Sequence, residues 1–184
     1  VEDASLPDVV QPFAAYYDAT ADAVRALAAD GDETRVFELM GDAWVEVPDV
    51  KTPSPRTSPA FYQDGARAWL YGGDADGPLS DLWIFDGVEW SEPDVASAPP
   101  LWVAGMALDT AGDLLLFGGS DALEHKHLAF RFQLEPTLGT AWEQRPAVLD
   151  DLVPNLPGAY ADDQHQVITL GGGIGGSTRS CNGN

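Results

Sequence analysis

Short apolar runs alternate with glycine, proline and acidic turn residues along this chain, and the pattern recurs at a nearly fixed spacing. The run ending in Tyr71-Gly72-Gly73 is followed 46 residues later by Phe117-Gly118-Gly119, and Trp44 lies 46 residues before Trp90. Two unrelated landmarks therefore share one period. A period of this length, with several apolar runs in each unit, is typical of a repeat architecture.

Each repeat contains runs that predict short β-strands separated by turns. The predicted strands are 60–63, 67–71, 82–85 and 89–92 in the second repeat, 105–108, 113–117, 129–132 and 141–144 in the third, and 159–162 and 166–170 in the fourth. Four strands joined by short turns predict one antiparallel sheet per repeat. The sequence therefore predicts an all-β protein.

The first repeat has a less regular sequence than the others. Sliding it forward by 46 residues without gaps superposes Tyr16, Phe37 and Trp44 on aromatic residues of the second repeat. It departs at Ala26-Leu27, which then occupy the place of Gly72-Gly73. Because glycine permits a positive φ angle, its absence predicts a different bend after that strand.

The repeats resemble the kelch repeat, whose pattern is a glycine pair after the second strand, an aromatic residue in the third and a tryptophan at the start of the fourth. The residues that carry the resemblance are Gly72, Gly73, Phe85 and Trp90, then Gly118, Gly119, Phe132 and Trp142, and in the first repeat Leu39 and Trp44. The resemblance implies a kelch-type β-propeller in which each tryptophan packs on a neighbouring blade. It does not imply one function, because a fold hosts many.

The repeats divide the chain into one partial propeller of about three and a half four-stranded blades. We assign blades to residues 1–48, 49–94 and 95–147, a half blade to 148–173 and a flexible tail to 174–184. Such a set cannot close a ring, and blades bury their faces only against neighbours. We expect the remainder from a segment beyond Asn184 or from another chain, of which a second copy is one form.

Composition narrows the class of partner. The chain of 184 residues has 30 acidic and 9 basic side chains and a formal charge of −21, which would repel nucleic acids and anionic membrane surfaces. No apolar run approaches the ~20 residues of a membrane span. The lone Cys181 cannot form an internal disulfide. We expect an extracellular, periplasmic or cell-surface protein.

Turns after the second and fourth strands share one end of a propeller, and loops are where binding residues concentrate. On this side Arg56 aligns with Trp102, 46 residues further on, and Trp102 aligns with Asn155, another 53 residues further on. We predict a ligand-binding rim formed by Arg56, Trp102, Asn155, Asp74, Asp76, Asp121 and Glu124. The alternative is that these are ordinary exposed loop residues.

Two groups of residues have the donor types of metal sites. Asp74, Asp76 and Asp81 resemble the start of a calcium loop, but calcium needs six or more oxygens and Pro78 stands where another ligand would be needed. His125 and His127, with Glu124, could coordinate zinc, but a lysine separates the two histidines and a third convincing ligand is lacking. We therefore expect no metal and no cofactor, with calcium as the alternative.

No combination of nucleophile, base and orienting group is evident in the sequence. We therefore predict a non-catalytic module that presents propeller loops to a protein or carbohydrate partner. One alternative is a sugar-modifying enzyme of the sialic-acid mutarotase type, which would use groups such as Arg56 and Glu124. Another is an assembly subunit that is completed by a second chain along its open blade edge.

Overall fold

The computed structural model describes residues 5–8, 10–94, 99–102, 104–108, 112–121, 129–132, 142–145, 158–161 and 167–170. Every regular element among these residues is a β-strand, and the strands pair antiparallel. The prediction of an all-β protein built from antiparallel sheets is thus confirmed. None of the described residues form a helix long and apolar enough to cross a membrane.

Within the described residues, the strands form three four-stranded sheets and one two-stranded sheet, each in simple sequence order. The first contains β1 (Gln11–Asp18), β2 (Ala23–Asp30), β3 (Glu33–Met40) and β4 (Ala43–Val47). The second contains β5 (Ala60–Asp64), β6 (Arg67–Tyr71), β7 (Leu82–Phe85) and β8 (Trp90–Ser91). The third contains β9 (Gly105–Leu108), β10 (Leu114–Phe117), β11 (Ala129–Phe132) and β12 (Glu143–Arg145), and the last pair is β13 (Gly158–Ala161) and β14 (Val167–Leu170).

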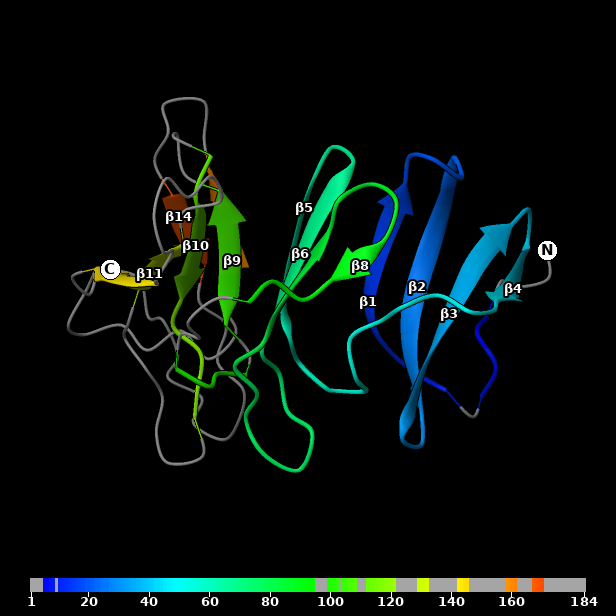
Figure 1. Cartoon of the computed structure of the whole chain (residues 1–184), viewed down its shortest axis with the longest axis horizontal. Coiled ribbons are helices and arrows are strands. Elements are labelled where there is room, and N and C mark those ends of the chain that lie inside the picture. The colour runs from blue at the N-terminus through cyan, green and yellow to red at the C-terminus, as the bar shows by residue number, and fades with distance from the viewer. Residues whose placement is uncertain are drawn as a thin grey trace, which may run out of the picture.

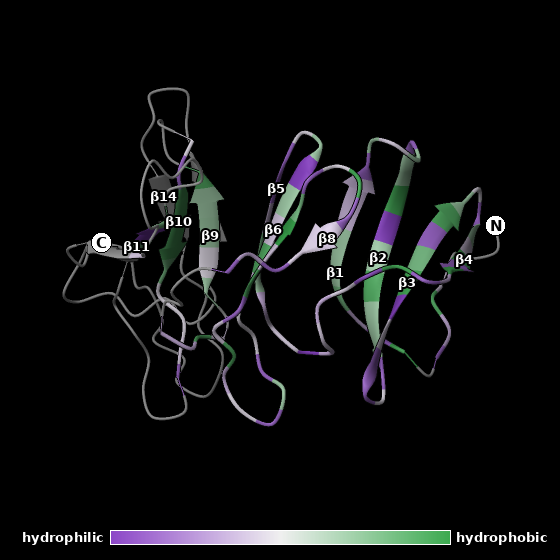
Figure 2. Ribbon diagram, viewed as in Figure 1, coloured by the Kyte–Doolittle hydropathy of each residue, from purple (hydrophilic) through white to green (hydrophobic). Residues whose placement is uncertain are grey.

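The first, second and third sheets follow one another in chain order across the view, and the strands of the first two sheets lie along roughly the same axis (Figure 1). The β1–β2, β3–β4, β5–β6 and β7–β8 turns lie at one end of the first two sheets, and the β2–β3 turn and β6–β7 loop lie at the other (Figure 1). Apolar residues are concentrated within the strands, and the connecting segments are mainly polar (Figure 2). The loop ends are therefore the polar surfaces of the molecule.

The strand register reproduces the period of the sequence. Leu39 pairs with Trp44, and Phe85 pairs with Trp90 at an offset of 46 residues for both partners. In the third sheet, the ring of Trp142 lies 5.0 Å from that of Phe132. The three tryptophans therefore occupy the same place in three successive sheets.

One equivalence differs from the gapless prediction. Tyr16 pairs with Arg25, whereas Tyr62, which lies 46 residues further on, pairs with Trp69, only 44 residues beyond Arg25. This register places Ala28-Ala29, and not Ala26-Leu27, at the position of the glycine pair. Because alanine continues a strand, β2 and β3 extend to a two-residue turn instead of opening into a loop.

The hydrophobic core is divided into layers between adjacent sheets. Tyr16, Leu27 and Val36 of the first sheet pack with apolar residues of the second, which include the fully buried Trp90. A second layer joins the second and third sheets, and its members include Tyr71 and Leu116. Each layer contains residues from two repeats, so neighbouring repeats stabilise one another.

A tryptophan–tyrosine contact recurs between adjacent sheets. The Trp90 ring meets Tyr16 edge-on, with centroids 5.4 Å apart, and the Trp142 ring meets Tyr71 in the same way at 5.1 Å. In both cases the tryptophan belongs to the later sheet. Edge-to-face aromatic pairs of this geometry contribute about 1 kcal/mol beyond the area they bury.

Candidate functional site

The most elaborate connection in the described chain is the β6–β7 loop, residues 72–81. It begins at Gly72 and Gly73, whose φ angles are +60° and +99°. These left-handed conformations turn the chain back on itself, so that Thr57 and Asp74 exchange backbone hydrogen bonds of 2.9 and 2.8 Å. The loop is thereby fixed to the segment that precedes β5.

Arg56 anchors this loop from inside the protein. Its side chain is fully buried, and its guanidinium donates five hydrogen bonds. Two go to the oxygens of Asp81 at 2.7 Å each, two to Ser54 at 2.9 and 3.0 Å, and one to the Gly72 carbonyl at 2.9 Å. A guanidinium has five N–H donors, so Arg56 has none left for a ligand.

Arg56 was predicted as part of the ligand-binding rim, but in the structure its guanidinium is buried and bonded within the protein. The sequence showed only an arginine in a proline- and serine-rich connection, where an exposed position is the usual outcome. Its burial depends on Asp81, 25 residues away, which supplies the compensating charge. Arg56 holds the loop in place and does not itself form the binding surface.

Asp81 is held ionised at the base of the loop. Burial opposes its charge, but the hydrogen bonds and charge of Arg56 outweigh burial and lower the pKa of this carboxyl below its usual value. The Trp83 indole adds a hydrogen bond of 2.7 Å. Lys51 lies over the Trp83 ring, with its ammonium 5.7 Å from the centroid. The anchor thus combines an ion pair, hydrogen bonds and a cation–π contact.

The tip of the loop displays two carboxylates of different kinds. Asp74 is partly buried, and its Oδ1 accepts a 2.9 Å hydrogen bond from the Gly77 amide, which closes a local turn. Asp76 is exposed and adopts a left-handed backbone with φ of +60°. Of the predicted rim residues, Asp76 is the one most openly presented to solvent on this loop.

The three aspartates of the predicted calcium loop do not converge on a common centre. Asp81 is directed to Arg56, and Asp74 is engaged within its own turn. In the part of the chain that the structure describes, no group of three or more His, Cys, Asp or Glu side chains could hold a metal ion. The oxygen-rich spacing 74–81 is therefore explained by turn formation and by the arginine anchor.

The third sheet repeats the loop attachment with different side chains. Trp102 and Ser120 exchange backbone hydrogen bonds of 2.9 and 3.0 Å, as Thr57 and Asp74 do. Trp102 is partly buried and Asp121 follows the bridge directly. The structural counterpart of Trp102 is thus Thr57, at an offset of 45 residues, rather than Arg56 at 46.

The remaining predicted rim and metal residues, Asn155, Glu124, His125 and His127, lie outside the described residues. Cys181 does too.

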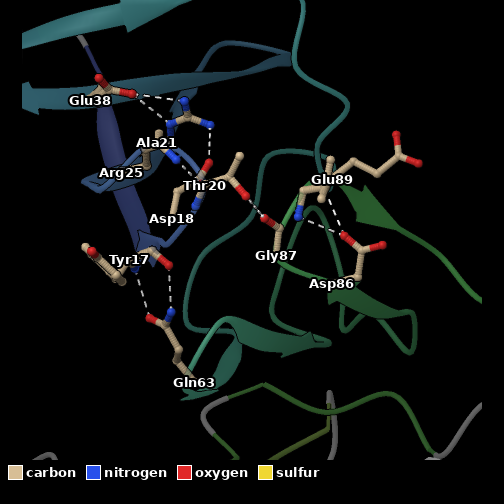
Figure 3. A network of polar contacts seen from close by, with 11 residues as sticks. Tyr17, Asp18, Thr20, Ala21, Arg25, Glu38, Gln63, Asp86, Gly87 and Glu89 are labelled. Carbon is tan, nitrogen blue, oxygen red and sulfur yellow. Dashed lines mark hydrogen bonds and ion pairs between the residues drawn. The ribbon is translucent and has the colours of Figure 1, made fainter.

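At the opposite end, a polar network that sequence reasoning missed joins the first two sheets (Figure 3). Arg25 bonds the buried Asp18 at 2.5 Å and also Glu38, with its Nε 3.0 Å from the carboxylate. The Gln63 amide accepts from the Tyr17 amide at 2.9 Å and donates to its carbonyl at 2.8 Å. The sequence shows Arg25 and Glu38 in two successive strands, but only the strand register shows that they pair directly.

A shallow polar hollow of about 400 Å³ lies beside the edge strand β4. Its charged lining residues are Glu33, Arg35, Glu46 and Asp49. Arg35 pairs with Glu46 at 3.5 Å and with Asp30 at 2.7 Å, so the basic group is already engaged by carboxylates. The lining of this hollow contains no aromatic side chain on which a sugar ring could stack.

These features were compared with known proteins. No family model and no curated protein matches this chain.

Proposed function

We propose that this chain is part of a kelch-type β-propeller and works as a non-catalytic binding module. The observation that carries the proposal is the β6–β7 loop, whose base is held by the buried Arg56–Asp81 pair while its tip presents Asp76 to solvent. A rigid base lowers the entropy lost when a displayed loop binds a partner. The left-handed backbone of Asp76, which aspartate adopts readily, forms the turn at the tip of the loop.

The propeller assignment is supported by the repetition of one sheet and one interface. Each four-stranded sheet has the same simple order, and in both layers the tryptophan of the later sheet packs on a tyrosine of the earlier one, Trp90 on Tyr16 of β1 and Trp142 on Tyr71 of β6. Radial repetition of such sheets is how propellers protect their edges. We propose that further sheets, from another chain or from a segment beyond Asn184, complete the ring.

The partner we propose is a protein or carbohydrate outside the cytoplasm. A formal charge of −21 disfavours anionic ligands, so the bound group is neutral or cationic. A sugar-modifying enzyme that used Arg56 on substrate would need a free guanidinium, and here all five donors are bonded to the protein. The geometry therefore favours binding over that chemistry.

Amide NMR spectra of the chain, titrated with a panel of neutral oligosaccharides and cationic peptides, would test the proposal. We expect shifts at residues 73–79, and weaker binding in Asp76→Asn. Asp42→Asn is the matched control, because it also removes an exposed carboxylate from a turn, at the opposite end of the sheets. Shifts confined to the Asp42 end, or equal effects of the two substitutions, would contradict this assignment. Turnover of a bound sugar would contradict the non-catalytic part.

A further inference from the structure

The start of β3 forms an unpaired sheet edge. β4 is an edge strand of the first sheet, and its pairing with β3 ends at Val36 and Val47. β3 itself begins at Glu33, so the stretch 33–35 lies beyond the end of β4. After Val47 the chain leaves the strand, and Asp49 adopts a left-handed backbone with φ of +59°. Residues 33–35 therefore pair with β2 on one side and with no described strand on the other.

The two hairpins that flank β3 show which backbone groups face this edge. Both turns have two residues between their closing pairs, Asp30 with Glu33 and Met40 with Ala43, and such closing pairs are hydrogen-bonded. Hydrogen-bonded and non-hydrogen-bonded pairs alternate along antiparallel strands, so Glu33 bonds towards β2 and Met40 towards β4. Counting from either hairpin, the N–H and C=O groups of Thr34 are directed to the β4 side.

Thr34 has no partner for these two backbone groups within the described chain. Its hydroxyl oxygen is buried and likewise has no hydrogen-bond partner among the described residues. Extended peptides bind proteins by adding a strand to a free sheet edge of this kind, where the backbone donors and acceptors supply the affinity. Thr34 therefore offers one donor and one acceptor to an added strand.

The polar hollow beside β4 lies along this edge. Four consecutive residues, from Glu33 to Val36, line it on one side, and residues 46–50 line it on the other. Consecutive residues of a strand point to opposite faces of a sheet, so a space bounded by all four lies along the edge and not over one face. The hollow is thus the space that a continuation of β4 would fill. Its volume of about 400 Å³ is within the range of roughly 300–1,000 Å³ that is usual for ligand sites.

The two faces of the sheet differ in charge along the hollow. Val36 and Val47 lie on the face that packs against the second sheet. Strand alternation places Glu33, Arg35 and Glu46 on the opposite face. The Arg35 guanidinium is already bonded to two carboxylates, whereas the exposed Glu33 forms no ion pair with another described residue. This face therefore has an excess of negative charge, and the other is apolar.

We propose that this edge binds an extended peptide in which two basic residues flank an apolar one, as in Lys-Val-Lys. The peptide runs antiparallel to β3, and its central residue exchanges two backbone hydrogen bonds with Thr34. Directly opposite residues share a face, so the central side chain lies beside Val36 and the two flanking side chains lie on the face of Glu33 and Glu46. The formal charge of −21 also attracts a cationic partner. This site belongs to the first sheet and is separate from the β6–β7 loop.

Isothermal titration calorimetry with a capped Lys-Val-Lys peptide tests the charge recognition. We expect binding to the unmodified chain. Glu33→Lys should weaken it about tenfold, because a repulsion replaces an attraction beside the peptide. Glu89→Lys is the matched control, since it makes the same change of charge at an exposed glutamate beside the β7–β8 turn, and it should have little effect. Absence of binding, or equal effects of the two substitutions, would overturn the proposal.

A second peptide tests the strand addition on the unmodified chain, so its result does not depend on how a variant folds. N-methylation of the central valine keeps both charges but removes the N–H that bonds the Thr34 carbonyl, and should weaken binding at least tenfold. Amide NMR shifts caused by the unmethylated peptide should centre on residues 33–36. Equal affinity of the two peptides would overturn strand addition. Asp76→Asn should leave this binding unchanged, so the result is separable from that for the β6–β7 loop.

Discussion

The guanidinium of Arg56 and the carboxylate of Asp81 form a bidentate pair, with both N–O distances 2.7 Å, between the segment before β5 and the residue before β7. The arginine side chain is fully buried, and that of the aspartate is 22% exposed. The Arg56 guanidinium bonds both ends of the β6–β7 loop, the Gly72 carbonyl at its start and the Asp81 carboxylate at its end. The loop's shape therefore depends on residues far from its tip.

Removing one partner of this pair should destabilise the protein strongly. We expect Asp81→Ala to lower the free energy of unfolding by about 3–5 kcal/mol, because Arg56 would be left as an unpaired buried cation. Urea denaturation measures the loss. The double variant Arg56→Met with Asp81→Leu should recover part of it, and a double variant less stable than both single ones would contradict the explanation. Arg67→Ala, at an exposed arginine, is the control.

The same pair predicts a dependence of stability on pH. Although burial opposes its ionisation, Arg56 lowers the pKa of Asp81 in the folded state, so the ionised carboxylate favours folding. This contribution is complete above the unfolded-state pKa of about 3.9 and is lost as pH falls through the lower folded-state pKa. In Asp81→Asn, the free energy of unfolding should therefore fall less steeply as the pH is lowered. An unchanged pH dependence would show that other carboxylates dominate it.

Gly72 and Gly31 allow the steric role of the glycine pair to be measured. Their φ angles are +60° and +59°, so alanine should suffer similar backbone strain of about 1 kcal/mol at both. At Gly72, however, a Cβ would lie 2.2 Å from the Leu101 carbonyl oxygen, whereas at Gly31 it would meet nothing within 4 Å. Thermal or urea unfolding should show a clearly larger loss for Gly72→Ala. Equal losses would mean that the backbone angle alone requires glycine.

Trp90 and Trp44 form a second matched pair, because they occupy the same register position in successive sheets. We expect Trp90→Ala to cost about 3–5 kcal/mol, since it empties a layer that the first sheet covers. Trp44→Ala should cost less, because its ring is only partly buried. Urea denaturation of the two variants checks both values. Comparable costs would contradict the view that a preceding sheet sets the difference.

Much of the architecture followed from the sequence. The predicted strands of the second and third repeats match β5 to β7 and β9 to β11 within one or two residues, because alternating apolar runs and turn residues act locally. The equivalence of Trp44 and Trp90 was also predicted, and the strand register bears it out. The kelch-type ring and the binding function remain proposals.

The local sequence pattern did not predict side-chain burial that depends on residues far away in the sequence. Sequence spacing alone determined the repeat, the strands and the glycine bends, since each is governed by the conformational preferences of a few consecutive residues. Only the tertiary structure decided that Arg56 is buried, because the carboxylate that makes its burial tolerable comes from 25 residues away. It likewise decided that Trp90 is buried and Trp44 only partly buried, because burial is a property of the neighbouring sheet and not of the repeat itself.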